Sequence, residues 1–94
     1  MFTTILQHDV QDFATWKVGF EAHKSARTAA GALRHTVGAL AGQPNTAVIV
    51  IDWSDKESFE KFMQDPSLAE AMKAGGVVGA PTVQWVEGTT HDHY

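Results

Sequence analysis

With 94 residues and an apolar content of 44%, the chain fits one small domain rather than two. It contains no cysteine, which excludes disulfides, thiolate metal ligands and cysteine nucleophiles. Its net charge is −4 and its basic residues are scattered, which argues against nucleic acid and anionic membranes as partners. The N-terminal residues lack the pattern of a signal peptide, and the longest apolar run, 47–51, is too short to cross a bilayer, so we expect a cytoplasmic protein.

The first elements along the chain are a predicted strand and a predicted helix. Residues 2–8 form a short β-branched and aromatic segment, as is typical of a strand. Asp12 is a candidate N-cap, because its carboxylate can accept the free N–H groups of a first helical turn. We expect one long helix from there to about Ala30, ended by Gly31 in the left-handed conformation that glycine adopts without strain.

The middle of the chain predicts an antiparallel hairpin. Two candidate strands, at about 33–41 and 46–53, are joined by the turn-forming residues 42–45. The stretch 47–51 is apolar at every position instead of alternating, which indicates a strand covered on both faces of its sheet. Helices can cover one of these faces, so something else must cover the other.

The rest of the chain predicts a second helix and a final strand. Ser54 and Glu57 have the spacing of a capping box, in which each side chain bonds the other residue's backbone N–H. Asp65 and Pro66 suit the restart of this helix, with the carboxylate as N-cap and the proline in the first turn. After a pair of glycines, residues 82–86 read as the last strand.

The order strand-helix-strand-strand-helix-strand predicts an α+β fold of the ferredoxin-like type, a four-stranded antiparallel sheet with both helices on one face. We expect residues 1–88 to form this domain, with 89–94 as a polar tail and the glycine-rich residues 75–81 as a mobile loop that can gate a pocket. Because the strands are apolar on both faces, we predict that a second copy packs sheet to sheet to give a homodimer.

Segments spread along the chain carry a resemblance to a known superfamily. They are residues 10–17, 20–23, Arg27, Gly31, 43–45, 65–68 and 74–81. In these segments the chain resembles the dimeric α/β-barrel superfamily, and within it the small cyclase-like and antibiotic-biosynthesis-monooxygenase-like proteins. The resemblance spans about residues 2–88 and implies a homodimer with a site for a small organic molecule.

Members of that superfamily differ in chemistry, so the fold implies no single reaction. They include cofactor-free quinone-forming oxygenases, polyketide cyclases, haem-degrading enzymes and lactone isomerases. The cofactor-free oxygenases tend to use an Asn on the first strand together with a Trp. The first strand of this chain has no Asn and offers Thr3, Thr4, Gln7 and His8 instead.

One face of the first predicted helix carries the most informative residues. At about 100° per residue, this face contains Phe13, Trp16, Phe20, His23, Arg27 and Ala30. The apolar members must face the sheet, so His23 and Arg27 lie on the core side, where a charge needs a partner, water or an anionic ligand. We expect His23 to act as acid and base, and Arg27 to hold a developing negative charge. The alternative is that His23 bonds a backbone carbonyl and Arg27 a surface carboxylate.

Other residues are candidates for the same site. His8 ends the first strand at the mouth of the predicted helix–sheet cleft and is expected to assist as a third catalytic residue. The expected ligand-binding residues are Trp16, Phe20, Phe62, Met72 and Trp85. His35 belongs either to this site or to the side of the sheet that faces the partner. Residues 91–93, His-Asp-His, have metal-ligand side chains, but a tail offers no rigid scaffold, so no metal site is predicted.

Two kinds of function remain open. The first is an enzyme without metal or other cofactor, of the cyclase/isomerase or monooxygenase type, that acts on a small planar carbonyl-bearing compound. The second is a protein without catalysis, either a module that binds a hydrophobic ligand or a structural dimer with a filled core. The sequence names no substrate, and it does not decide between these alternatives.

Overall fold

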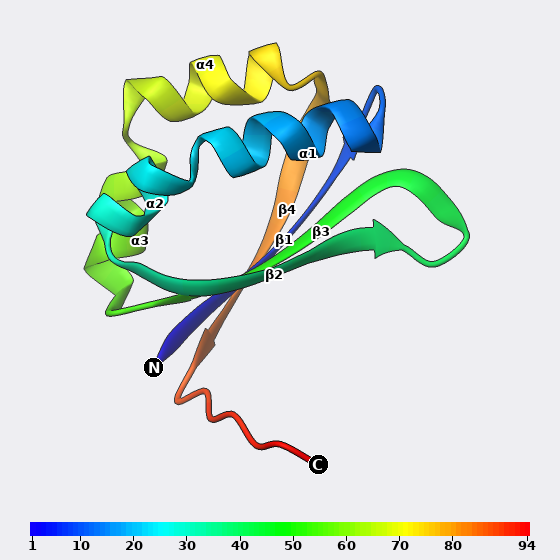
Figure 1. Ribbon diagram of the computed structural model, residues 1–94. Helices are drawn as coiled ribbons and strands as arrows, with labels where there is room; N and C mark the ends of the chain where they lie inside the picture. The colour runs from blue at the N-terminus through cyan, green and yellow to red at the C-terminus, as the bar shows by residue number, and fades with distance from the viewer.

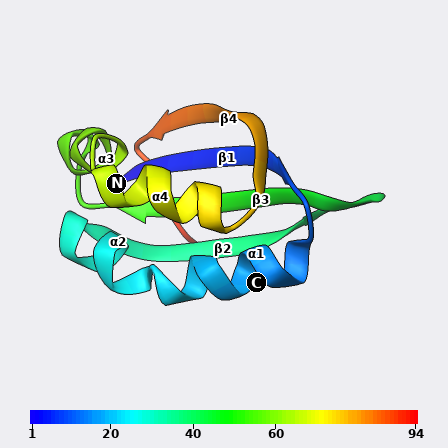
Figure 2. The same cartoon turned by 90° about the horizontal axis from the view of Figure 1, so that it is seen from above.

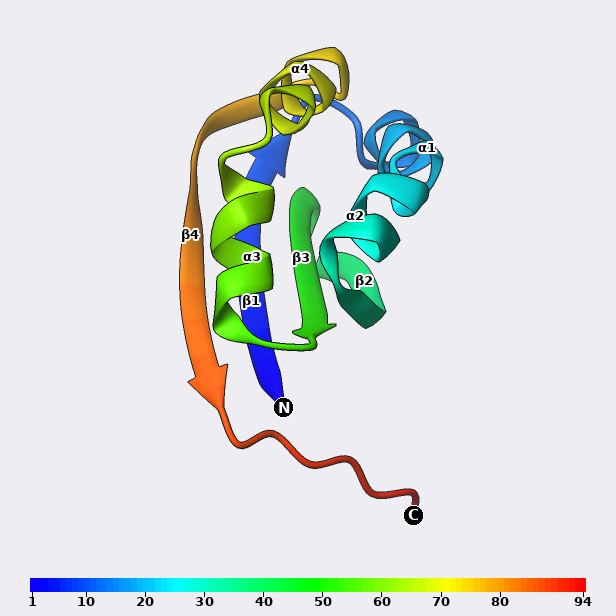
Figure 3. The ribbon, with the colours of Figure 1, turned by 90° about the vertical axis from the view of Figure 1, so that its left-hand side faces the viewer.

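In the computed structural model, which describes residues 1–94, a four-stranded antiparallel sheet has the strand order β2-β3-β1-β4. The strands are β1 (Phe2–Val10), β2 (Ala32–Leu40), β3 (Gln43–Trp53) and β4 (Val77–Glu87). The helices cover one face of this sheet and leave the other face open (Figure 1; Figure 3). This arrangement confirms the predicted ferredoxin-like α+β fold.

Each predicted helix is divided in two. The four segments are α1 (Phe13–Ala22), α2 (Lys24–Ala30), α3 (Lys56–Met63) and α4 (Pro66–Ala74). Figure 2 shows two arms, α1 with α2 and α3 with α4, that lie beside each other over the sheet. The second division falls at the predicted restart, where Asp65 Oδ1 accepts the Ser67 N–H at 2.9 Å. None of these helices combines the length and apolar character that a membrane span requires.

The division at His23 was not predicted, because the apolar periodicity continues through it. The His23 N–H is shared at 3.2 Å between the Gly19 carbonyl, the α-helical acceptor, and the Phe20 carbonyl, the acceptor of a tighter turn. The Phe20 carbonyl also accepts a hydrogen bond from Arg27 Nη1 at 2.8 Å. An arginine side chain therefore helps to satisfy the backbone at the break. Gly31 ends α2 with a φ of 112°, as predicted.

The capping box predicted at the start of the third helix is wrong. Asp55, not Ser54, is the N-cap of α3, and its Oδ1 accepts the Ser58 N–H at 2.7 Å and the Ser58 hydroxyl at 2.8 Å. A carboxylate suits the positive end of the helix dipole, so it takes the cap in preference to the neighbouring hydroxyl. The Ser54 hydroxyl instead lies 3.1 Å from that of Ser58.

The hairpin strand and the last strand are both longer than predicted. β3 begins at Gln43 because Ala41 and Gly42 alone make the turn, with Gly42 at a φ of 80°. The predicted mobile loop at 75–81 is also wrong, since β4 begins at Val77 and pairs there with β1. Residues 79–81 of β4 lie opposite the single residue His8, so the ladder contains a bulge, where Pro81 and its missing N–H are tolerated.

The hydrophobic core lies between the sheet and the helices. Its buried apolar residues are Phe2, Val10, Trp16, Ala47, Ile49, Ile51, Trp53, Phe59 and Phe62. Alternation along β3 directs Ile49 and Ile51 toward the helices and Val48 and Val50 toward the open face. Val48 and Val50 are only half-buried, so the sheet has apolar side chains on both faces, as the sequence indicated.

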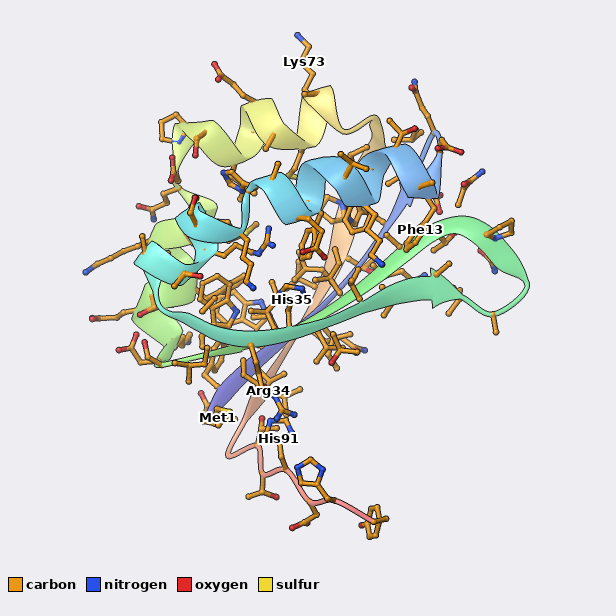
Figure 4. All side chains as sticks on the ribbon, in the orientation of Figure 1. Met1, Phe13, Arg34, His35, Lys73 and His91 are labelled. Carbon is orange, nitrogen blue, oxygen red and sulfur yellow. The ribbon has the colours of Figure 1, made fainter.

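The C-terminal residues cross one end of the open face. The N–H groups of residues 88–89 donate to the Met1 carbonyl at 3.0 and 3.1 Å. Further along, His91 Nε2 lies 2.7 Å from Asp52 Oδ2, which also accepts Arg34 Nε at 2.8 Å. Figure 4 shows Arg34 and His91 together on the side of β2 away from the helices. The predicted polar tail is therefore attached to the sheet through a buried carboxylate.

Candidate functional site

An apolar cavity lies between the helices and the sheet. It has a volume of about 80 Å³, and its aromatic walls are Trp16, Phe20, Trp53, Phe59 and Phe62. The polar side chains among its lining residues are His8, His23 and Arg27, and no carboxylate is among them. The cavity therefore brings together the three residues that the sequence suggested as catalytic. Their roles stay a prediction.

His8 reaches the cavity from β1, beside the bulge. It is 6% exposed, and its ring packs edge-on against Trp16 with 5.4 Å between centroids. Its Nδ1 is buried and has no hydrogen-bond partner. Burial lowers the pKa of His8 below 6.5, and the nearby Asp9 carboxylate opposes this only in part. At neutral pH the ring is therefore uncharged, and a free ring nitrogen can accept a proton.

Arg27 reaches the cavity from α2 and is 4% exposed. Its guanidinium carbon lies 3.6 Å from the centre of the Phe20 ring, and Nη1 donates to the Phe20 carbonyl. Nη2 is buried without a partner, and the residue forms no ion pair. Burial lowers its pKa, with Glu21 opposing, although a guanidinium remains charged in proteins. The alternative in which Arg27 pairs with a surface carboxylate is therefore wrong.

His23 stands at the break between α1 and α2, on the route from the cavity to the surface. Its Nε2 lies 3.3 Å from the Ser67 hydroxyl of α4, and its ring centre lies 5.9 Å from that of Phe62. It lines the cavity and also a second, outer hollow between α1 and α4. The polar contact of His23 is thus with a hydroxyl of the other helix arm. The alternative drawn from the sequence, a hydrogen bond from His23 to a backbone carbonyl, is not what the side chain makes.

Four of the five expected ligand-binding residues line the cavity, namely Trp16, Phe20, Phe62 and Met72. Trp85 does not. It is 48% exposed and packs edge-on against Phe2 and Phe59, with 5.9 and 5.4 Å between ring centroids. Alternation along β4 does direct Trp85 to the helix side, where it pairs with Thr4. Ile51, which pairs with Thr4 from the other side, lines the cavity, so Trp85 is excluded because it lies on the edge strand β4 and not because of its position along the strand.

Several strand residues that line the cavity were missed, among them Leu6, Ile49 and Ile51. The available signal was alternation, because Leu6 lies two positions before His8 and so shares its face. His35 lies on the helix side of β2 (Figure 4), with its ring 5.0 Å from that of Phe20, and does not line the cavity. No group of three or more His, Asp or Glu side chains has a geometry that could hold a metal ion.

Comparison with known proteins places this fold among solved structures. No family model and no curated protein matches the chain. SnoaB, a cofactor-independent oxygenase from Streptomyces nogalater, matches with a TM-score of 0.72 and 19% identity over 96% of this chain and 94% of SnoaB. A monooxygenase from the gene ActVA-Orf6 of Streptomyces coelicolor, in complex with nanaomycin D, matches with a TM-score of 0.69 and 18% identity over 99% of this chain and 91% of that one. A dimeric ferredoxin-like protein from an uncultured marine organism matches with a TM-score of 0.67 and 17% identity over 99% of this chain and 100% of that one.

Other matching structures bear the name antibiotic biosynthesis monooxygenase. The chain thus has the ferredoxin-like fold of the antibiotic-biosynthesis-monooxygenase-like proteins, and the predicted resemblance is confirmed at that level. At 17–19% identity these likenesses show the fold, while activity and site residues have to be argued from the chain itself.

Proposed function

We propose that the protein binds a small planar compound with a carbonyl or ring-hydroxyl group in the cavity and converts it without a metal or organic cofactor. The reaction would be of the monooxygenase or the cyclase/isomerase type. Two structures that share the fold support the oxygenase branch, since one is described as a cofactor-independent oxygenase and the other as a monooxygenase with bound nanaomycin D.

The observation that carries this proposal is that His8 and Arg27 line one apolar cavity and that each has a buried nitrogen without a partner, Nδ1 and Nη2. Leaving a buried polar group unpaired costs about 1–3 kcal/mol, and more when the group is charged. A ring hydroxyl can donate to His8, and an oxygen with negative charge can accept from Arg27. The aromatic walls suit the flat remainder of such a molecule.

The two groups also suit the first chemical step. Neutral His8 can take the proton of a ring hydroxyl or an acidic C–H, and Arg27 can hold the negative charge that develops. In the oxygenase branch, the deprotonated ring passes electrons to dioxygen. One oxygen atom stays on the ring, which becomes a quinone, and the other leaves as water. In the cyclase branch, the carbanion left by loss of the C–H proton attacks a carbonyl carbon of its own molecule, and the alkoxide formed from that carbonyl takes up the proton.

His23 takes a different part in this scheme from the one the sequence suggested. It lines both the cavity and the outer hollow, whereas His8 is enclosed. We therefore assign the proton abstraction to His8 and give His23 the exchange of that proton with solvent. A histidine suits this exchange because its ring nitrogens can both accept and donate a proton.

We also propose that two copies pack sheet to sheet. The open face carries Ile5, Val48 and Val50, which are half-buried in the single chain, and Val86, which is 39% exposed. A face of this kind is a candidate interface, and a twofold axis would cover it with the same face of a second copy. The description of one matching structure as a dimeric ferredoxin-like protein supports this arrangement.

Incubation with a panel of phenols and naphthols in air-saturated buffer, without added metal, tests the function. We expect dioxygen uptake with formation of a quinone, and a loss of about 100-fold or more in His8→Gln and Arg27→Met. Val18→Leu, on the exposed side of α1, serves as the control that keeps activity. Binding without conversion would favour the non-catalytic module, and absence of both binding and conversion would refute the proposal.

A further inference from the structure

We infer that ligands reach the cavity between α1 and α4, through an opening that Gly19 keeps clear. The inference rests on the proposed function, because it concerns access to the same cavity. It starts from a glycine that neither the backbone nor the packing of α1 explains.

Gly19 lies inside α1, where glycine is about 1 kcal/mol less favourable than alanine. Its φ is not positive, so the backbone does not call for glycine. A Cβ added at this position would meet no atom within 4 Å. Gly31 is the opposite case, since it has a φ of 112° and a Cβ there would lie 2.9 Å from the Ser58 Cβ. Gly19 is exposed, so the space beside it is open toward solvent, and the glycine leaves it open.

This space joins two hollows. Gly19, His23, Ala71 and Gly75 line both the cavity and the outer hollow between α1 and α4. The cavity therefore meets the outer hollow at these residues, and three of the four have at most a methyl group as side chain. His8 and Arg27, which have the buried nitrogens without partners, line the same cavity.

The far side of the opening is a weakly held helix. α4 has no buried residue, whereas α3 buries Phe59 and Phe62. Across the opening, the Ser67 hydroxyl of α4 makes a polar contact with His23 Nε2 at 3.3 Å. Elements with little buried surface open locally at small free energies. α4 can therefore move away from α1 while the core beneath α3 stays closed.

Entry of fluorobenzene and para-fluorophenol, followed by fluorine NMR, tests this route. Fluorobenzene reports access alone, and para-fluorophenol adds the hydroxyl that the proposed function requires. In Gly19→Leu we expect fluorobenzene to associate about ten times more slowly than in the wild type, because the side chain fills the opening. Val18→Leu is the matched control and should stay within about threefold of the wild-type rate, whereas Gly19→Ala should fall between the wild type and Gly19→Leu. All three variants should melt no lower than the wild type, because alanine and leucine are better helix formers than glycine or valine.

The outcomes separate the route from the function. Wild-type rates in Gly19→Leu, or a wild-type protein that takes up no fluorobenzene, would overturn the inference. Slow entry in Gly19→Leu, with Val18→Leu near the wild-type rate, would support it. If para-fluorophenol then binds no more tightly than fluorobenzene to the wild type, the route stands and the polar recognition in the proposed function fails.

Discussion

Replacement of Arg27 by methionine should remove ligand recognition at little cost to the stability of the fold. The arginine is 4% exposed, forms no ion pair, and leaves Nη2 unpartnered. In other proteins, exchanging a buried ion pair for apolar residues of similar volume has often been neutral or has stabilised the fold by about 1–4 kcal/mol, and a buried charge without a counter-charge is harder still to bury. If Arg27 is present for a ligand, its loss should follow that pattern.

The same replacement also removes two favourable interactions of Arg27, and their combined free energy is similar to the expected gain. The hydrogen bond from the charged Nη1 to the Phe20 carbonyl contributes about 1.5–3 kcal/mol, and the guanidinium on the Phe20 ring about 0.5–2 kcal/mol. The carbonyl is not left unpaired, because it still accepts the His23 N–H at 3.2 Å. We therefore expect the free energy of unfolding to stay within about 2 kcal/mol of the wild-type value. For a chain of this length that is a change in melting temperature of at most roughly 10 °C.

Urea denaturation at neutral pH, with para-fluorophenol and fluorobenzene binding measured alongside, checks both halves of this prediction. The preference for the phenol should fall by about 10-fold or more, since a hydrogen bond to a charged group is worth about 1.5–3 kcal/mol. Arg27→Lys is the matched control and should be less stable than Arg27→Met, because an ammonium is more strongly hydrated than a guanidinium. A methionine variant that loses more than about 2 kcal/mol would refute the reasoning, because Arg27 would then be a structural residue.

Two further predictions concern pH and assembly. Because burial lowers the pKa of His8 below 6.5, the unfolded chain binds a proton more readily than the folded protein, so stability falls as pH drops from 6.5 to the folded pKa, by at most about 1.4 kcal/mol per pH unit. His8→Phe should lose that part of the slope in urea denaturation, and an unchanged slope would assign it to another group. Val50→Lys should turn the dimer into a monomer in sedimentation velocity, while Val18→Lys, at a site 72% exposed, should not. A dimeric Val50→Lys protein would argue against sheet-to-sheet packing.

The order of strands and helices could be predicted because its signals are local. Asp12 and Gly31 mark the ends of the first helical arm, and both act as predicted. The features that were missed depend on particular contacts that hydrophobic periodicity and capping residues do not reveal. The break at His23 involves the side chain of Arg27, and the early start of β4 depends on its pairing with β1.

The candidate site was predictable to the extent that one helix face determines it. Counting positions along the helix grouped Trp16, Phe20, His23 and Arg27, and all four line the cavity. The same counting could not find Gly19, since a residue without a side chain carries no periodic signal. It also could not exclude Trp85, because a strand pattern gives the face of a residue but not its distance from a cavity on that face.

The bulge in β4 bears on how such a sheet can vary in length. Residues 79–81 lie opposite His8 alone, so β4 has two more residues than β1 over this stretch. An even excess keeps the side-chain alternation in phase, and Val77 and Val83, on either side of the bulge, both pack against the core. A single extra residue would instead have moved every later side chain of β4 to the opposite face of the sheet. Insertions or deletions by pairs at this point would therefore preserve both faces of the sheet while changing the space beside His8, which offers evolution or design a way to resize a pocket from within a paired strand.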